Sequence, residues 1–222
     1  MTAAVHSDLV KIQYYQNSQN PTRAVIGLHG WTGDEHSMVP VAKSMNLENT
    51  KWYIPRAPYR SDVGKGFTWF SGNEETGWKY DKTFEVTTSL ITQVLGDGFV
   101  PKNIYLIGFS MGAGLCFHVA LRLDFPLGGI VPIAGLIKNP DQLISTSTRA
   151  SRKTPILILH GTQDEIVNPE YSRKAYQLLR DNGFTVRLET YKAPHKIPLR
   201  TGKIIKEFMR NKHIHFTNEN RI

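Results

Sequence analysis

The chain contains 222 residues, of which 40% are hydrophobic and 21% are charged, with one cysteine and a formal net charge of +8. This length is typical of a single compact domain, here expected to span residues 1–222, and it leaves little room for a separate cap or regulatory domain. A single cysteine excludes an internal disulfide and a thiolate metal cluster, and therefore a disulfide-stapled scaffold or a zinc ribbon.

The first eight residues contain no basic region leading into an apolar run, and no uncharged stretch approaches the roughly 20 residues of a membrane span. We therefore expect a cytoplasmic protein. The positive charge could attract nucleic acid, acidic lipid or an anionic substrate. Because the basic residues are scattered, a solvated basic surface is the simpler interpretation. We expect no nucleic-acid partner, and at most a weak attraction to a membrane surface or an anionic substrate.

Short apolar segments alternate along the chain with longer segments of helical periodicity. The expected strands are residues 9–15, 24–28, 51–54, 103–107, 129–134, 155–159 and 185–191. The expected helices are residues 81–95, 111–123, 169–182 and 196–210. This alternation predicts an α/β fold with a mostly parallel sheet covered by helices on both faces. Residues 213–222 are polar and are expected to form a loose tail, with one more strand or a partner contact as the alternatives.

The segment Gly108-Phe109-Ser110-Met111-Gly112 lies between an expected strand and an expected helix. A serine at the apex of such a sharp turn has a strained backbone, and side chains two positions before and after it would collide with neighbouring backbone. Gly108 and Gly112 avoid those collisions. Ser110 is therefore the expected nucleophile, facing the positive end of the helix that follows. The alternative, a serine that only caps the helix, would explain neither glycine.

A serine nucleophile needs a base, and the base needs a carboxylate that orients it. In folds with this turn, the acid and then the histidine follow the serine in the sequence. Asp164 is the expected acid because it directly follows an apolar strand. Asp124 and Asp181 fall at helix ends, and Asp141 belongs to a turn or a helix cap.

The expected base is His195, which lies in the loop between the last expected strand and the last expected helix. A side chain in that loop can reach over the nucleophile. The other histidines after Asp164, His213 and His215, belong to the tail beyond that helix.

Four motifs occur in order and resemble the α/β-hydrolase superfamily. They are residues 28–34, 108–112, 160–164 and 194–197. The segment Pro55-Arg56-Ala57-Pro58 and the pair Trp69-Phe70 are similar to the phospholipase/carboxylesterase branch, which includes acyl-protein thioesterases. The resemblance spans residues 24 to 212. It implies an α/β-hydrolase fold without a large cap domain.

The resemblance also implies an oxyanion hole formed by the backbone N–H groups of Trp31 and Met111, with His29 bracing the loop that carries Trp31. Two preorganised amides of this kind stabilise the tetrahedral intermediate of acyl transfer. The chemistry requires no metal ion and no organic cofactor.

The same resemblance places Trp31, Met111, Trp69 and Phe70 around the nucleophile, as the lining of an apolar substrate pocket. For Trp69 and Phe70, a place in the core is the alternative. Residues 135–154, where many relatives insert a lid, have room for only one short helix and turns. We therefore expect an open site, suited to small soluble esters or thioesters.

The predicted function is a two-step serine ester hydrolase that acts through an acyl-enzyme. The alternatives are a lysophospholipase or acyl-protein thioesterase, a small peptidase or amidase, and a noncatalytic binding protein with a hydrolase-like fold. The protein is expected to be a monomer or a homodimer.

Overall fold

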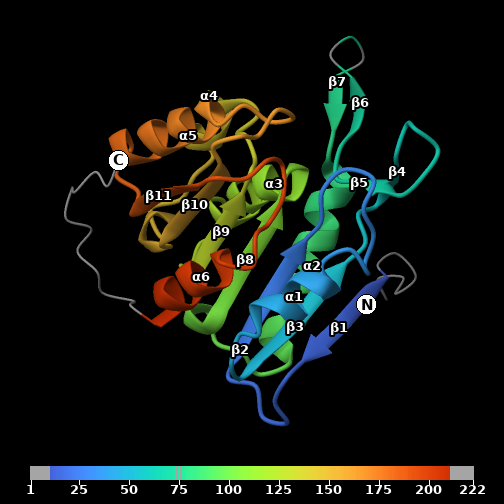
Figure 1. The fold of residues 1–222 in the computed structure, drawn as a ribbon, viewed down its shortest axis with the longest axis vertical. Coiled ribbons are helices and arrows are strands. Elements are labelled where there is room, and N and C mark those ends of the chain that lie inside the picture. The colour runs from blue at the N-terminus through green and yellow to red at the C-terminus, as the bar shows by residue number, and fades with distance from the viewer. Residues whose placement is uncertain (1–10, 74, 76, 211–222) are drawn as a thin grey trace, which may run out of the picture.

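The computed structural model describes residues 11–73, 75 and 77–210. Within these residues the main sheet has seven strands in the order β1-β3-β2-β8-β9-β10-β11 (Figure 1). The strands are β1 (Ile12–Gln16), β2 (Arg23–Leu28), β3 (Thr50–Pro55), β8 (Ile104–Phe109), β9 (Gly129–Ile133), β10 (Ile156–Gly161) and β11 (Val186–Tyr191). Only β1, at one edge, runs antiparallel to its neighbour. The mostly parallel α/β sheet is thus confirmed.

Helices cover both faces of this sheet. One face carries α2 (Asp81–Gly96), α3 (Met111–Ala120), α4 (Pro140–Ser145) and α5 (Glu170–Asp181). The other face carries α1 (Val39–Met45) and α6 (Thr201–Arg210), which lie in front of the sheet in Figure 1. Short 3₁₀ turns occupy Pro101–Asn103 and Ser151–Lys153.

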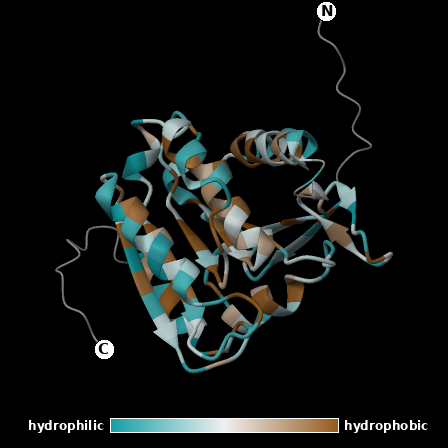
Figure 2. Ribbon diagram, turned by 90° about the horizontal axis from the view of Figure 1, so that it is seen from above, coloured by the Kyte–Doolittle hydropathy of each residue, from teal (hydrophilic) through white to brown (hydrophobic). Residues whose placement is uncertain are grey.

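Alternate side chains of each central strand enter different cores. In β8, Leu106 packs into the core beneath α2, α3 and α5, whereas Ile107 packs into the core beneath α1 and α6. This two-sided burial explains why the central strands are continuously apolar in sequence. Figure 2 shows the result, with apolar strands at the centre and hydrophilic faces on the outer helices.

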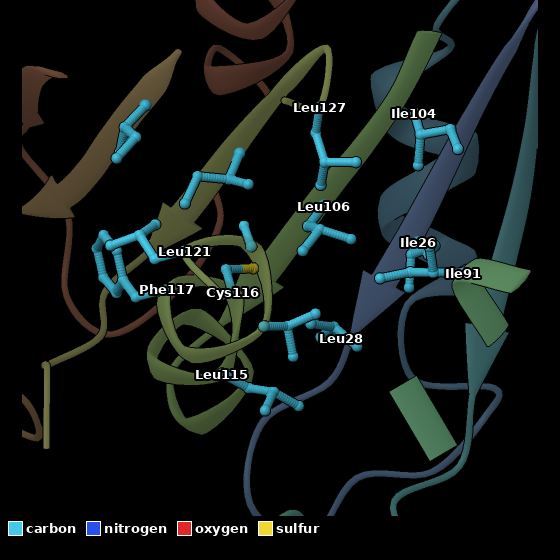
Figure 3. Packing of buried hydrophobic residues seen from close by; sticks show 14 of the residues in the cluster. Ile26, Leu28, Ile91, Ile104, Leu106, Leu115, Cys116, Phe117, Leu121 and Leu127 are labelled. Atoms are coloured by element: carbon cyan, nitrogen blue, oxygen red, sulfur yellow. The ribbon is translucent and has the colours of Figure 1, made fainter. Parts of the chain in front are cut away.

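Helix α3 lies deep in the first core and follows β8 directly. All its residues from Gly112 to Ala120 are buried, and Figure 3 shows Leu115, Cys116 and Phe117 among the apolar side chains of the neighbouring strands. A helix that is apolar all round is buried all round. The packing therefore fixes the direction of α3, and with it the position of the turn at its first residue.

Helix α1 and two short hairpins are elements that the sequence did not predict. The hairpins are formed by β4 (Tyr59–Arg60) with β5 (Phe67–Thr68) and by β6 (Ser71–Asn73) with β7 (Gly77–Lys79). The β6–β7 hairpin projects from the body of the molecule (Figure 1).

Two helix boundaries differ from the prediction by three residues or more. Helix α6 begins at Thr201 instead of residue 196 because Pro198 interrupts the preceding segment, and its carbonyl accepts hydrogen bonds from both the N–H and the hydroxyl of Thr201. Helix α3 ends at Ala120 instead of residue 123. The expected strand over residues 9–15 is described only from residue 11, and the predicted tail, with His213 and His215, lies outside the described residues.

In the described part of the chain, no helix is both long enough and apolar enough to cross a membrane.

Candidate active site

Ser110 occupies the turn between β8 and α3 with a φ of 54° and a ψ of −115°. A positive φ is costly for any residue other than glycine, so the surroundings must hold this conformation. A Cβ on Gly108 would lie 2.2 Å from the carbonyl oxygen of Gly112, and a Cβ on Gly112 would lie 2.2 Å from that of Leu28. Both glycines are therefore required by close backbone packing. The Ser110 side chain makes no capping hydrogen bond to α3, which argues against a purely structural role.

His195 and Asp164 form a direct hydrogen bond in the loops that follow β11 and β10. The distance from His195 Nδ1 to Asp164 Oδ2 is 2.6 Å. The other carboxylate oxygen, Oδ1, accepts hydrogen bonds from the backbone N–H groups of Ile166 and Val167 at 3.0 and 2.8 Å. Burial alone would raise the pKa of Asp164, but the hydrogen bonds from His195, Val167 and Ile166 outweigh it and hold this pKa below its ordinary value.

An ionised carboxylate can only accept hydrogen bonds, so Nδ1 of His195 carries the proton in this pair. The Nε2 atom is then available as a base. The His195 ring packs on Phe109, the residue before Ser110, with 4.7 Å between ring centroids. No hydrogen bond joins Ser110 to His195 in the described residues, and such catalytic bonds often tighten only when substrate is bound.

A second Ser-His-Asp arrangement lies behind the first and shares Asp164. His160 Nδ1 lies 2.6 Å from Ser172 Oγ, while its Nε2 lies 2.9 Å from the Val167 carbonyl oxygen and 3.2 Å from Asp164 Oδ2. Since a carbonyl oxygen only accepts, Nε2 carries the proton and Ser172 donates its own proton to Nδ1. Burial lowers the pKa of His160, which keeps the ring neutral.

This second arrangement has the residue types of a catalytic triad but lacks access to a substrate. His160 is 0% exposed and Ser172 is 1% exposed, and neither lines the large cavity described below. The arrangement therefore braces the Asp164 loop. His160 belongs to a motif quoted above, but sequence reasoning did not pair it with Ser172, which stands on α5 with no distinguishing pattern around it.

His29 holds the loop that follows β2. Its Nδ1–H donates to the carbonyl of Gly30 at 2.7 Å, and its Nε2 accepts the N–H of Ala57 at 3.1 Å. Burial lowers the pKa of His29, which keeps the ring neutral, as this pattern of one donor and one acceptor requires. The loop thus presents the Trp31 backbone beside the Ser110 turn.

In the described part of the chain, two backbone N–H groups beside Ser110 have no hydrogen-bond acceptor. Met111 is the first residue of α3, so its N–H has no acceptor within the helix. The N–H of Trp31 donates to no acceptor among the described residues. Both residues line the same cavity as Ser110.

A cavity of about 480 Å³ opens at Ser110. Phe70 lines it, as the sequence predicted, together with Trp78 from the β6–β7 hairpin, which was not predicted. Trp69 does not match the expected lining role, because it is 0% exposed and donates its indole N–H to the carbonyl of His29 from behind the site. Trp31 is 48% exposed at the mouth. Residues 135–154 form only α4 and a 3₁₀ turn, so among the residues that the structure describes this segment places no large lid over the cavity.

In the described residues, no group of three or more histidine, cysteine, aspartate or glutamate side chains is placed to hold a metal ion.

Known proteins share both the sequence pattern and the fold. The family model described as Phospholipase/Carboxylesterase matches residues 12–213. Carboxylesterase SOBER1 from Arabidopsis thaliana is 26% identical over 204 residues, which cover 85% of this chain and 90% of that protein. Acyl-protein thioesterase 1 from Debaryomyces hansenii is 30% identical over 188 residues, which cover 76% of this chain and 81% of that protein.

Solved structures of known proteins have the same fold as this chain. The crystal structure of esterase PE8 has a TM-score of 0.81 at 25% identity and covers 92% of this chain and 99% of that chain. The crystal structure of Arabidopsis thaliana SOBER1 has a TM-score of 0.76 at 24% identity and covers 86% of this chain and 98% of that chain. The fold is therefore that of these enzymes.

Proposed function

Because the chain belongs to the phospholipase/carboxylesterase family of α/β-hydrolases and is a carboxylesterase/thioesterase-like serine hydrolase, we propose that it cleaves small to medium acyl esters or thioesters with Ser110, His195 and Asp164. The observation that carries this assignment is the 2.6 Å hydrogen bond between His195 and Asp164 beside the strained Ser110 turn, which opens into the cavity.

The proposed reaction has two steps. His195 Nε2 accepts the Ser110 proton while Oγ attacks the acyl carbonyl, and the N–H groups of Trp31 and Met111 stabilise the oxyanion. His195 then protonates the leaving alcohol or thiol. In the second step His195 activates a water that hydrolyses the acyl-enzyme, which releases the acid and restores Ser110. Asp164 holds the His195 tautomer throughout.

Thioesters form the second candidate substrate class. The 30% identity to an acyl-protein thioesterase supports it, as does an apolar cavity large enough for an acyl chain. Rates on p-nitrophenyl esters from acetate to palmitate, compared with the matching thioesters, separate a short-chain esterase from a long-chain thioesterase. The proposed compartment is the cytoplasm, which agrees with a single cysteine that is buried and free.

The two Ser-His-Asp arrangements make a direct test available. A fluorophosphonate probe should label the wild type and Ser172→Ala equally, and should not label Ser110→Ala. Turnover of p-nitrophenyl acetate should fall by at least about 10⁴-fold in Ser110→Ala and stay within several-fold of the wild type in Ser172→Ala. Equal labelling of the wild type and Ser110→Ala, or loss of labelling in Ser172→Ala alone, would overturn the assignment.

A further inference from the structure

The loop that carries Trp31 contains a residue with a strained backbone. Thr32 has a φ of 63°, which is a clear outlier for a β-branched side chain. A hydrogen bond of 3.1 Å from the Gly33 N–H to the Gly30 carbonyl closes a turn over residues 30–33, called here the Thr32 turn. A strained residue keeps its conformation only where the surrounding structure holds it, so neighbouring groups must hold Thr32.

The β4–β5 hairpin holds the Thr32 turn through close backbone packing. A Cβ on Gly66, the residue before β5, would lie 1.8 Å from the carbonyl oxygen of Thr32 and 2.8 Å from its Cα. The next residue, Phe67, donates its backbone N–H to the Gly33 carbonyl at 2.9 Å, and the two residues form an isolated β-bridge. The hairpin therefore packs directly on the strained residue and on the residue after it.

The side chain of Phe67 is held between two guanidinium groups. The Cζ of Arg56 lies 4.4 Å from the centre of the Phe67 ring, and that of Arg60 lies 4.6 Å from it. Arg56 also donates the two hydrogen bonds of 2.5 Å to the carboxylate of Glu35, which lies on the same loop as the Thr32 turn. One arginine thus joins the hairpin to the loop a second time.

The second residue of β5 contacts Met111, the first residue of α3. Thr68 Oγ1 lies 3.1 Å from Met111 Sδ and 2.9 Å from the Phe70 carbonyl oxygen, so its single proton is available to either acceptor. Thr68 is 5% exposed and, like Met111, lines the cavity. Successive residues of β5 therefore contact the two segments that carry the expected oxyanion donors, with Phe67 on the loop and Thr68 on α3.

We propose that Gly66, Phe67 and Thr68 are positioning residues of the oxyanion hole. Gly66 and Phe67 hold the Thr32 turn and thereby aim the Trp31 N–H at the reacting carbonyl, while Thr68 keeps β5 against α3. This inference rests on the proposed function. A donor stabilises the oxyanion only from about 2.7–3.1 Å, so a small displacement of the turn weakens transition-state binding and leaves substrate binding nearly unchanged.

The main test compares Gly66→Ala with Gly64→Ala in the hydrolysis of p-nitrophenyl acetate. Both glycines lie in the β4–β5 hairpin at positive φ, 66° and 76°, so alanine adds similar backbone strain at each. No described atom lies within 4 Å of a Cβ at position 64, whereas a Cβ at position 66 meets Thr32. We expect kcat to fall by about 10²-fold in Gly66→Ala with little change in KM, and to stay within about twofold in Gly64→Ala.

Inhibition by butylboronic acid gives a readout that a purely structural role would not change. Ser110 Oγ adds to the trigonal boron as its proton passes to His195, and one oxygen of the resulting tetrahedral boronate takes the place of the oxyanion. The inhibition constant should therefore rise in Gly66→Ala in parallel with the loss of kcat/KM. The Tm values of Gly66→Ala and Gly64→Ala should differ much less than their rates.

The Thr68 contact is tested by a pair of substitutions. Thr68→Val keeps the shape of the side chain but removes the hydroxyl, and kcat should fall severalfold. Thr68→Ser keeps the hydroxyl and should retain most of the wild-type kcat. This pair also decides the question if Gly66→Ala does not fold.

Three results would overturn the proposal. They are equal kcat in Gly66→Ala and Gly64→Ala, an unchanged inhibition constant despite a lower kcat in Gly66→Ala, and equal kcat in Thr68→Val and Thr68→Ser. Failure of the wild type to hydrolyse any ester, or full turnover by Ser110→Ala, would instead reject the proposed function.

Discussion

At the scale of single residues, two histidines approach one oxygen of the same carboxylate in opposite tautomers. His195 presents Nδ1–H to Asp164 from the exposed side, and His160 presents Nε2–H to it from the core. The Val167 carbonyl fixes the His160 tautomer, and the Asp164 carboxylate fixes that of His195. The buried histidine therefore has a structural role, and the accessible one has the free nitrogen that proton transfer needs.

Replacement of Asp164 by asparagine should affect catalysis far more than folding. The amide is nearly isosteric but cannot reproduce the carboxylate, so His195 loses the partner that selects its tautomer. We expect kcat on p-nitrophenyl acetate to fall by about 10⁴-fold, with only a small change in Tm. His160→Phe is the comparison. It should lower Tm clearly while the folded protein keeps kcat within about tenfold, and a larger kcat loss in His160→Phe than in Asp164→Asn would contradict these roles.

The glycines of the Ser110 turn give a prediction about stability. Gly112→Ala places a Cβ 2.2 Å from the Leu28 carbonyl oxygen, so the backbone must move and the turn must open. We expect loss of fluorophosphonate labelling together with a marked drop in Tm. Gly96→Ala is the control, because nothing lies within 4 Å of a Cβ at that helix-end position. It should keep full labelling with equal or slightly higher Tm, and a harmless Gly112→Ala would show that the turn tolerates a side chain.

At the scale of the elements, the loop after β2 is fixed from two sides. His29 holds its start, and the Glu35 carboxylate accepts two hydrogen bonds of 2.5 Å from Arg56, which follows β3. Burial would raise the pKa of Glu35, but the hydrogen bonds and charge of Arg56 outweigh it and the pKa lies below its ordinary value. The pair thus joins the ends of two neighbouring strands at the catalytic edge.

The Glu35 pair should give the protein a pH-dependent contribution to stability. A carboxyl whose pKa is lower in the folded state stabilises the fold above its unfolded pKa of about 4.3, and this contribution is lost as the pH falls through the folded pKa. Glu35→Gln should therefore lower the free energy of unfolding by about 2 kcal/mol at neutral pH. Denaturant unfolding at several pH values should show that the difference in the free energy of unfolding between the wild type and Glu35→Gln becomes smaller below about pH 4. A difference that grows as the pH falls would contradict a stabilising ion pair between Glu35 and Arg56.

The strands of the main sheet and the helices α2, α3, α5 and α6 were predictable from the sequence, whereas the shorter helix α1 and the two hairpins were not. Continuous apolar segments such as residues 156–159 identify central strands because both their faces are buried. The β4–β5 and β6–β7 hairpins have two or three residues per strand, which is too short for any periodic pattern. For this reason the sequence could not show that Trp78 reaches the cavity.

The candidate site was also only partly predictable from the sequence. Ser110, Asp164 and His195 could be predicted because each is the residue type that acyl transfer needs and each lies just beyond an expected strand. Trp69 and Phe70 are adjacent in sequence and equally aromatic, yet one packs behind His29 and the other lines the cavity. Only the tertiary structure decides which of two neighbouring aromatic residues faces the substrate.

At the scale of the whole molecule, the net charge of +8 should affect the rate at which the protein and its substrate associate more than the rate of the chemical steps. A positive surface raises the rate of association with anionic substrates, and salt screens that effect over about 10 Å at 0.1 M ionic strength. We expect kcat/KM for an anionic acyl-CoA thioester to fall severalfold between about 0.01 M and 1 M salt. The value for neutral p-nitrophenyl acetate should change little. Equal salt dependence for the two substrates would show that the charge plays no part in encounter.

The buried thiol of Cys116 lies directly beneath the nucleophile turn. It is the single cysteine of the chain, it is fully buried, and its Sγ lies 2.7 Å from where a Gly108 Cβ would stand. Burial raises the pKa of this thiol, so it stays protonated and unreactive while the turn is closed. A thiol reagent can modify it only during a transient opening of the native state. The rate of that modification therefore measures how often the Ser110 turn opens, with no substitution in the protein.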